Sequence, residues 1–259
     1  MKVSDAMEKT TLAVIILTYN EEKNIETCIN SARFADEIIL IDSGSTDKTK
    51  KIAEALGAKV YGHLMGAEGF AGQRNLALGK TQADWLLYLD ADERLTLELM
   101  EEIKKLVLED PCCYKIKRVN YIFGKRVVYG GHAPDYIARL FPRKQVKWSG
   151  IVHERALSDL SIKKTRGHIC HYTYSSWEMY FEKFNKYTTL MAKKMHDNGK
   201  KATMADILFR PCFAFTKYYI FKLGFLDGFL GFAFSVMNAF YTLVKYLKLK
   251  YYQADKPLD

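Results

Sequence analysis

Two nearly unbroken apolar runs in the first hundred residues end in polar clusters. Residues 14–17 (VIIL) lead into TYNE at 18–21, and residues 85–89 (WLLYL) lead into DADE at 90–93. Apolar runs of this kind are typical of strands that are buried on both faces of a parallel sheet. Open α/β sheets bind ligands at the carboxyl ends of their strands. The sequence therefore predicts a parallel sheet whose polar edge suits a nucleotide and a metal.

The segments around these runs alternate between helix and strand patterns. The expected helices cover residues 21–33, 47–56 and 71–79, and the expected strands cover 37–41 and 58–61. The polar run DSGSTD at 42–47 is typical of a turn followed by a helix N-cap. Strands that alternate with helices imply right-handed crossovers and a parallel sheet.

Downstream of Cys112 the pattern changes to short β-rich pieces. These pieces are residues 114–119, 126–129, 136–141 and 162–172. From Trp177 the pattern is helical, because apolar side chains recur there every three or four residues. We expect this helical pattern to break at Lys200-Lys201 and again at Arg210-Pro211.

Three motifs, in this order and spacing, carry a family resemblance: the polar run at 18–21, the turn at Asp42 and Asp90-Ala91-Asp92. Together they resemble the family-2 glycosyltransferases of the GT-A fold. Among these, the chain is most similar to the bacterial lipopolysaccharide-core β-1,4-glucosyltransferase branch. The motifs cover roughly Leu12 to Tyr174.

This resemblance implies a division of the chain into two parts. A Rossmann-like α/β domain of the GT-A fold would occupy residues 1–175, with a donor half at about 12–110 and an acceptor half at about 111–175. Residues 176–259 would form an amphipathic helical extension that is basic and aromatic.

The resemblance also implies a role for each residue at the strand ends. The base and ribose of a UDP-sugar would be held by Thr18, Tyr19, Asn20 and Glu21. Asp42 would contact the uracil edge, although an aspartate in such a turn is also a common turn former. Asp90 would help to hold the ribose and Asp92 would ligate a metal, with Ala91 between them. Capping of the next helix is the alternative explanation for these two aspartates.

Arginines at three places are candidates for anion contacts. Arg74, in the segment Gln73-Arg74-Asn75, matches a family segment that touches the donor, and its planar fork suits a carboxylate or phosphate. A plain surface helix start is the alternative. Arg139 and Arg143 are further candidates for phosphate contacts, although exposed hairpin arginines are more common.

A divalent cation suits the polar edge for a chemical reason. The diphosphate of a nucleotide sugar is densely negative, and hard cations such as Mg²⁺ or Mn²⁺ neutralise that charge through oxygen ligands. The resemblance adds His171 to Asp92 as a metal ligand, and a histidine simply packed on a strand is the alternative. Zinc held by His168, Cys170 and His171 is disfavoured, because strand alternation puts His171 on the opposite face from the other two.

The catalytic base is expected in WSGIVHE at 148–154. An inverting transfer needs a carboxylate that takes the proton of the acceptor hydroxyl. Relatives carry an acidic pair at this place, so Glu154 aligns with the base while His153 replaces the first acid. Asp135 is the alternative base.

The last hundred residues carry the excess charge of the chain. Residues 1–159 hold 23 basic and 23 acidic residues, whereas residues 160–259 hold 16 basic and 7 acidic residues. Within this part, residues 223–244 are apolar with a single charge, Asp227, and lysines lie on both sides. Glycines and Asp227 interrupt the stretch, so we expect helices that lie at an anionic membrane surface rather than a span. Packing on the catalytic domain or on a second subunit is the alternative.

These features predict an inverting, metal-dependent glycosyltransferase that uses a UDP-sugar, with glucose as the expected sugar, and a lipid-linked saccharide such as lipopolysaccharide core. A polyprenyl-phosphate sugar transferase is the alternative, and a non-catalytic basic module on membrane or nucleic acid is a distant one. We expect no nucleic-acid partner, because no usual signature is present. Five scattered cysteines and a polar start predict a cytoplasmic protein, peripheral on the inner face of the cell membrane.

Overall fold

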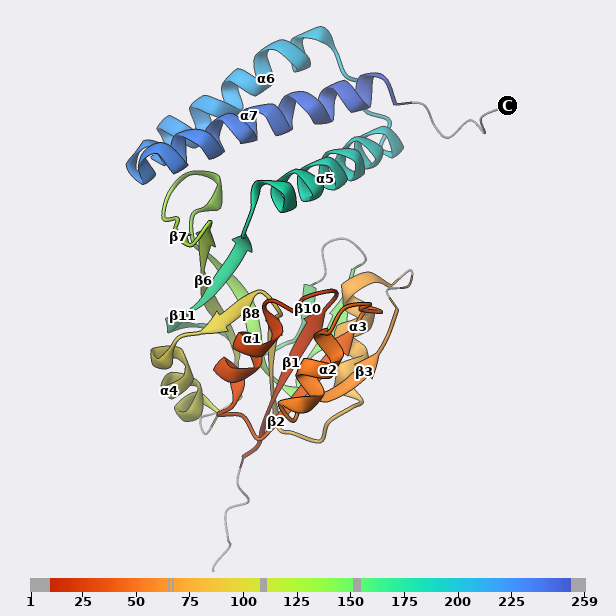
Figure 1. Ribbon diagram of the computed structural model, residues 1–259, viewed down its shortest axis with the longest axis vertical. Helices are drawn as coiled ribbons and strands as arrows, with labels where there is room; N and C mark the ends of the chain where they lie inside the picture. Colours follow the sequence, from red (N-terminus) through yellow and green to blue (C-terminus); the bar gives the residue numbers. More distant parts are fainter. Residues whose placement is uncertain (1–9, 65, 67, 108–110, 151–154, 253–259) are drawn as a thin grey trace, which may run out of the picture. The chain divides into compact units, whose positions relative to one another are not determined.

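The computed structural model describes residues 10–64, 66, 68–107, 111–150 and 155–252 (Figure 1). The chain forms two compact units. Unit 1 contains the chain up to Arg118 together with Asp135–His171, and unit 2 contains Val119–Pro134 together with the chain from Tyr172 onward. The expected division between residues 175 and 176 stays a prediction.

A mixed sheet runs through unit 1, with its parallel half built from the first four strands. These strands are β1 (Leu12–Thr18), β2 (Glu37–Asp42), β3 (Lys59–Gly62) and β4 (Trp85–Asp90), in the order β3-β2-β1-β4. Thr18 lies opposite Asp42, and Leu17 lies opposite Asp90. The register therefore brings the polar ends of three strands to one edge, as the sequence predicts.

Antiparallel strands extend the sheet beyond β4. They are β8 (Asp135–Pro142), β6 (Cys113–Ile122), β11 (Ile162–Tyr174) and β5 (Glu93–Leu95), in that order. Two short strands, β9 (Lys147–Ser149) and β10 (Arg155–Leu157), pair separately. The pairing of β11 with β5 places His171 opposite Glu93, so a residue far along the chain reaches the acidic turn after β4.

Helices cover both faces of this sheet because alternate side chains of its strands point to opposite sides. One face packs against α1 (Ile25–Ala32), α2 (Thr49–Ala55) and α4 (Leu97–Leu106), and the other packs against α3 (Gly69–Leu78) and β9. In β1, Val14 and Ile16 point to the first face, whereas Ile15 points to the second. Burial of each such side chain contributes about 1.5–3 kcal/mol to folding.

Helices dominate unit 2. They are α5 (Trp177–Asp197), α6 (Met204–Thr216), the π-helical turn η3 (Lys217–Phe221), the 3₁₀ turn η4 (Gly224–Asp227) and α7 (Gly228–Lys250). Aromatic and aliphatic side chains of α5, α7 and the segment 119–134 share one apolar cluster, which includes Ile122, Val127, Tyr180, Phe184 and Phe234. The segment also contains β7 (Lys125–Arg126), which pairs with β6, and the 3₁₀ turn η1 (Gly130–His132).

Two predicted features of this region are wrong. Pro211 lies inside α6 and does not end it, because packing through Ile207 and Ala214 outweighs the loss of one helical hydrogen bond. The strand expected at 126–129 ends at Arg126. The backbone N–H groups of Val128 and Tyr129 donate instead to the carboxylate of Asp227, at 3.1 and 2.8 Å.

Candidate active site

The turn after β2 is built around the Asp42 carboxylate. Asp42 is 1% exposed, and its Oδ2 accepts the backbone N–H groups of Gly44 and Ser45 at 3.0 and 2.9 Å. Gly44 has φ +94°, a conformation that favours glycine. Asp42 is therefore the turn former that its sequence context allows, and only one of its two carboxylate oxygens is used for this purpose.

Several buried polar atoms lie unpaired around this turn. Among the described residues, Asp42 Oδ1, Thr18 Oγ1, His63 Nδ1 and Gln73 Oε1 have no hydrogen-bond partner. Gln73 is held in place because its Nε2 donates to the Ser43 hydroxyl at 2.6 Å and to the His63 carbonyl at 3.2 Å. Each unpaired buried polar group costs about 1–3 kcal/mol. Such a concentration at the carboxyl ends of β1, β2 and β3 is typical of a binding site for a polar ligand.

The polar run after β1 is tied to the segment that follows Asp42. Asn20 has φ +52°, and its backbone N–H donates to the Ser45 hydroxyl at 2.9 Å while its Oδ1 accepts the Thr46 N–H at 2.9 Å. The Glu21 N–H donates to the Thr49 hydroxyl at 2.8 Å. These bonds fix the loop, so Tyr19, which is 58% exposed, projects from a rigid support.

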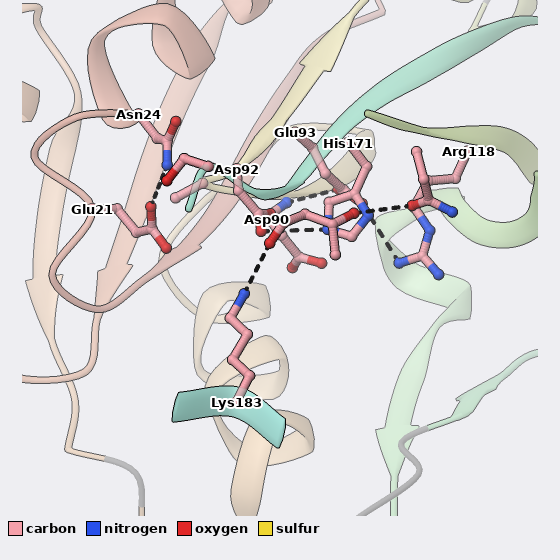
Figure 2. A network of polar contacts seen from close by, with 12 residues as sticks. Glu21, Asn24, Asp90, Asp92, Glu93, Arg118, His171 and Lys183 are labelled. Carbon is pink, nitrogen blue, oxygen red and sulfur yellow. Dashed lines mark hydrogen bonds and ion pairs between the residues drawn. The ribbon is translucent and has the colours of Figure 1, made fainter. Parts of the chain in front are cut away.

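The acidic turn after β4 is held by a buried ion network (Figure 2). Arg139, on β8, is 4% exposed, and its Nη2 donates to Asp90 Oδ2 and, at 2.9 Å, to Glu93 Oε1. Glu93 is fully buried, and its Oε2 accepts the backbone N–H of Asp90 at 2.9 Å. Arg74 Nη2 lies 3.5 Å from Asp90 Oδ1. Glu93 thus fixes the backbone of Asp90, and Arg139 and Arg74 fix its carboxylate.

This network shifts the acidity of its carboxyl groups in opposite directions. Burial would raise the pKa of Asp90, but the guanidinium groups of Arg139 and Arg74 outweigh it and hold the pKa well below its ordinary value. For Glu93 burial dominates, and the pKa is raised although Arg139 opposes the shift. Asp90 therefore stays ionised at neutral pH.

Asp92, on this turn, faces His171 of β11 (Figure 2), with His171 Nε2 3.3 Å from Asp92 Oδ2. One carboxylate and one imidazole fit a Mg²⁺ or Mn²⁺ ion that takes its remaining ligands from substrate phosphates and water. Within the described parts of the chain, no cluster of three or more His, Cys, Asp and Glu side chains suits a metal. Asp92 and His171 therefore fit a metal that shares its coordination with a bound ligand.

Arg74 links the acidic turn to the strand that precedes the predicted base. Its guanidinium lies 4.7 Å from the Trp148 ring centre and 5.4 Å from that of Tyr88. The next residue, Asn75, donates to the Trp148 carbonyl at 2.8 Å and accepts the Trp148 N–H at 2.9 Å. The start of the segment 148–154 is therefore anchored to α3. Glu154 and His153 lie outside the described residues, so their predicted roles stay predictions.

The other candidates fall into two groups. Arg139 belongs to the buried network, whereas the side chain of Arg143 donates to the Ala83 carbonyl at 2.8 Å near the opposite, amino-terminal end of β4. Arg143 thus lies at the other end of β4 from the acidic turn, and its phosphate contact stays a prediction. Asp135 is half exposed and pairs with Arg118 at 3.0 Å.

Sequence reasoning missed two residues that shape the acidic turn. Glu93 was part of the DADE run without a role, yet it is the buried partner of Arg139. Arg94 donates from Nη1 to the carbonyls of Ala91 and Glu93 at 2.8 and 2.7 Å, and so fixes the turn backbone. Glu93 and Arg94 follow the acidic pair directly in the sequence, and two charged residues at this place could have been noticed. Their partners, however, are known only from the pairings of β5 and β8 in the sheet.

The sheet, with its acidic turn and its unpaired acceptors at one edge, defines a glycosyltransferase of the GT-A fold. The chain belongs to glycosyl transferase family 2, whose model matches residues 13–188.

Two relatives agree with this class. An uncharacterized glycosyltransferase of Rickettsia bellii is 30% identical over 92% of this chain and 86% of its own. A lipopolysaccharide core biosynthesis glycosyltransferase, LpsC, of Rhizobium meliloti is 28% identical over 92% of each chain. A solved structure, glucosyl-3-phosphoglycerate synthase from Mycobacterium tuberculosis in complex with Mn²⁺, UDP and glucosyl-3-phosphoglycerate, is 26% identical, with a TM-score of 0.34 over 44% of each chain. The chain thus matches less than half of that solved protein.

Proposed function

We propose that this protein is an inverting, metal-dependent glycosyltransferase that moves glucose from UDP-glucose to a lipid-linked saccharide, such as the core of lipopolysaccharide. The observation that carries the donor assignment is the set of unpaired buried acceptors beside the acidic turn. The similarity to LpsC over nearly the whole chain supports the acceptor class.

Uracil binding follows from the chemistry of the β2 turn. Uracil presents one N–H donor between two carbonyl acceptors, and the unpaired Asp42 Oδ1 is an acceptor at the carboxyl end of β2. Thr18, directly opposite Asp42 in the register, carries a hydroxyl that both donates and accepts. We assign the base to Asp42 and Thr18, with Tyr19, Asn20 and Glu21 completing the nucleoside pocket.

The acidic turn serves the ribose and the diphosphate. Asp90, kept ionised by its two arginines, accepts hydrogen bonds from ribose hydroxyls through its exposed side. Asp92 and His171 would hold Mg²⁺ or Mn²⁺, and that ion would supply neutralisation of the charge that builds on the departing UDP. Ala91 is small and buried, so it leaves room between the two aspartates.

Glu154 is proposed as the base that takes the proton of the acceptor hydroxyl as that oxygen attacks C1 of the sugar. Bond formation to C1 and loss of UDP occur in one displacement, so an α-linked donor gives a β-linked product. Trp148 and Asn75 hold the strand that leads to Glu154. The acceptor carries a lipid, and we place the enzyme at the cytoplasmic face of the membrane because unit 2 is basic and exposes aromatic side chains.

The test is transfer from UDP-glucose to an extracted lipid acceptor by the wild type and three variants. Asp92→Ala and Glu154→Gln should each lose at least about a hundredfold in kcat. Glu101→Gln, at an exposed carboxylate on α4 that pairs with Lys104, is the matched control and should behave as the wild type. Wild-type turnover by either site variant removes its assigned role. Turnover on polyprenyl phosphate that survives Glu154→Gln would instead identify a polyprenyl-phosphate sugar transferase, because an ionised acceptor needs no base.

A further inference from the structure

The connection between α6 and α7 exposes an unusual concentration of aromatic side chains. Phe209 and Phe213 of α6, Phe221 of η3, Phe225 of η4 and Phe229 of α7 are all exposed, with 83% of Phe229 and 70% of both Phe209 and Phe221 accessible. We call residues 208–232 the apolar tip. Monomeric soluble proteins rarely expose contiguous apolar patches of this kind, so the apolar tip indicates an interaction surface.

Ring contacts connect the four elements of the apolar tip. Tyr219 of η3 contacts Phe215 of α6, Phe225 of η4 and Phe232 of α7, with ring centres 5.2–6.1 Å apart. Phe232 also lies 6.4 Å from Phe229. These rings join α6, η3, η4 and α7.

Charge around the apolar tip favours an anionic partner. Its basic residues are Arg210, Lys217 and Lys222; Arg210 pairs with Asp206, whereas both lysines are exposed. Its single acid, Asp227, is engaged within unit 2, because its carboxylate accepts the N–H groups of Val128 and Tyr129. Exposed phenylalanines with lysines nearby suit the boundary between the anionic headgroups and the acyl chains of a lipid bilayer.

Length alone would allow the C-terminal helix to cross a membrane. The segment Gly224–Lys250 is long and apolar enough for a span, and 17% of its most apolar 18 residues are buried. The far end of α7, however, is bound to the rest of unit 2. Lys248 Nζ donates to Asn185 Oδ1 at 2.7 Å and to the hydroxyls of Thr188 and Thr189 at 2.9 and 2.7 Å, all on α5.

A span would break this anchor. Tyr246 is almost fully buried, and its hydroxyl accepts from Lys200 Nζ at 3.3 Å. Lys245 is partly buried, and that burial lowers its pKa. A transmembrane α7 would have to strip Tyr246 and Lys248 of these hydrogen bonds to the rest of unit 2, which is unfavourable.

We propose that the apolar tip inserts into one leaflet of an anionic bilayer while the C-terminal half of α7 stays outside it, docked on α5. This inference rests on the proposed location of the acceptor in a membrane and adds the surface and the depth of contact. The tip would enter about 5–10 Å, to the boundary between headgroups and acyl chains. A leaflet-deep contact leaves unit 2 folded as it stands.

Vesicle binding tests the surface. Sedimentation with phosphatidylglycerol/phosphatidylethanolamine vesicles should capture the wild type, whereas Phe221→Glu/Phe229→Glu should bind at least about tenfold more weakly. Leu190→Glu, at a side chain of α5 that is 51% exposed, is the matched control and should bind as the wild type. Equal binding by the double variant overturns the proposal. A second result would also overturn it: the wild type forms a dimer and binds no vesicles, and the double variant is a monomer. The apolar tip would then be an interface between two copies of the chain.

Accessibility tests the depth. Two variants are made in a background of Cys170→Ser and Cys212→Ser, which leaves only buried cysteines. Phe229→Cys is labelled with a fluorophore before it binds vesicles, and Leu247→Cys is left unlabelled. Lipid-borne quenchers should act on position 229, and a membrane-impermeant thiol reagent added outside should modify position 247. Protection of position 247 would establish a span and overturn the proposal. Binding of UDP with Mn²⁺ by the double variant, measured in solution, separates a failure of the tip from a failure of the glycosyltransferase assignment.

Discussion

Replacement of Arg139 by methionine is expected to lower the free energy of unfolding by about 3–5 kcal/mol. Arg139 is 4% exposed and pairs with both Asp90 and the fully buried Glu93. Methionine fills much of the same volume but leaves the Glu93 carboxylate with the more distant Arg118, whose Nη1 lies 3.9 Å away. The cost is therefore that of an undercompensated buried charge and not of lost packing.

The loss of unfolding free energy in Arg139→Met should increase as the pH rises. Burial already raises the pKa of Glu93, and removal of Arg139 raises it further. A carboxyl group whose pKa is raised on folding favours the folded state below its unfolded pKa, and this advantage is lost as pH rises through the folded pKa. Asp90, whose lowered pKa stabilises the wild type above the unfolded pKa, loses that contribution in the variant. The deficit should thus be smallest near about pH 5 and grow toward about pH 8.

The assay is urea unfolding followed by tryptophan fluorescence at these two pH values. Arg139→Met/Glu93→Gln should recover at least about half of the deficit at the higher pH, because the buried charge is gone. Arg143→Met removes an arginine that bonds to a backbone carbonyl, and should cost about 1 kcal/mol at both pH values. A double variant as unstable as the single variant, with a deficit independent of pH, would refute the reasoning. Transfer activity of Arg139→Met should fall about 10–100-fold, because Asp90 is no longer held.

Three further predictions concern other parts of the molecule. Asp42→Asn should weaken UDP binding about tenfold in calorimetry, because an amide is a poorer acceptor for uracil, and unchanged affinity would contradict the base assignment. Asn75→Ala removes both hydrogen bonds to the Trp148 backbone. Because these bonds position the segment that carries the proposed base, kcat should fall by a larger factor than KM rises, and a change in KM alone would argue against this role. Asp227→Ala should abolish hydrogen-exchange protection of the Val128 and Tyr129 amides and cost about 1–2 kcal/mol of stability, and retained protection would show that another group holds them.

Much of the first half of the fold was predictable from sequence because its signals are local. The strands at β1, β2 and β4 are apolar without interruption, and each is followed by turn residues, so their positions and their parallel pairing follow. Family membership confirms the class of enzyme. The role of each donor-site residue stays a prediction, although the structure brings Asp42, Asp90, Asp92 and His171 to the same edge of the sheet.

The C-terminal half was less predictable because its signals are ambiguous at short range. Pro211 reads as a helix breaker, but the contact of α6 with α7 tolerates it. Asp227 reads as an unexplained charge in an apolar stretch, and its purpose depends on two amides that lie nearly a hundred positions earlier in the chain. Local propensity contains no information about such a partner.

The order and chemistry of the polar strand ends thus predicted, from sequence alone, a parallel sheet whose polar residues share its carboxyl edge. Tertiary structure decided which charged side chains form buried ion pairs and which can contact a ligand. Arg139 and Glu93 acquire their meaning only when β8 packs beside β4, because a buried ion pair is defined by its surroundings and not by its neighbours in the chain.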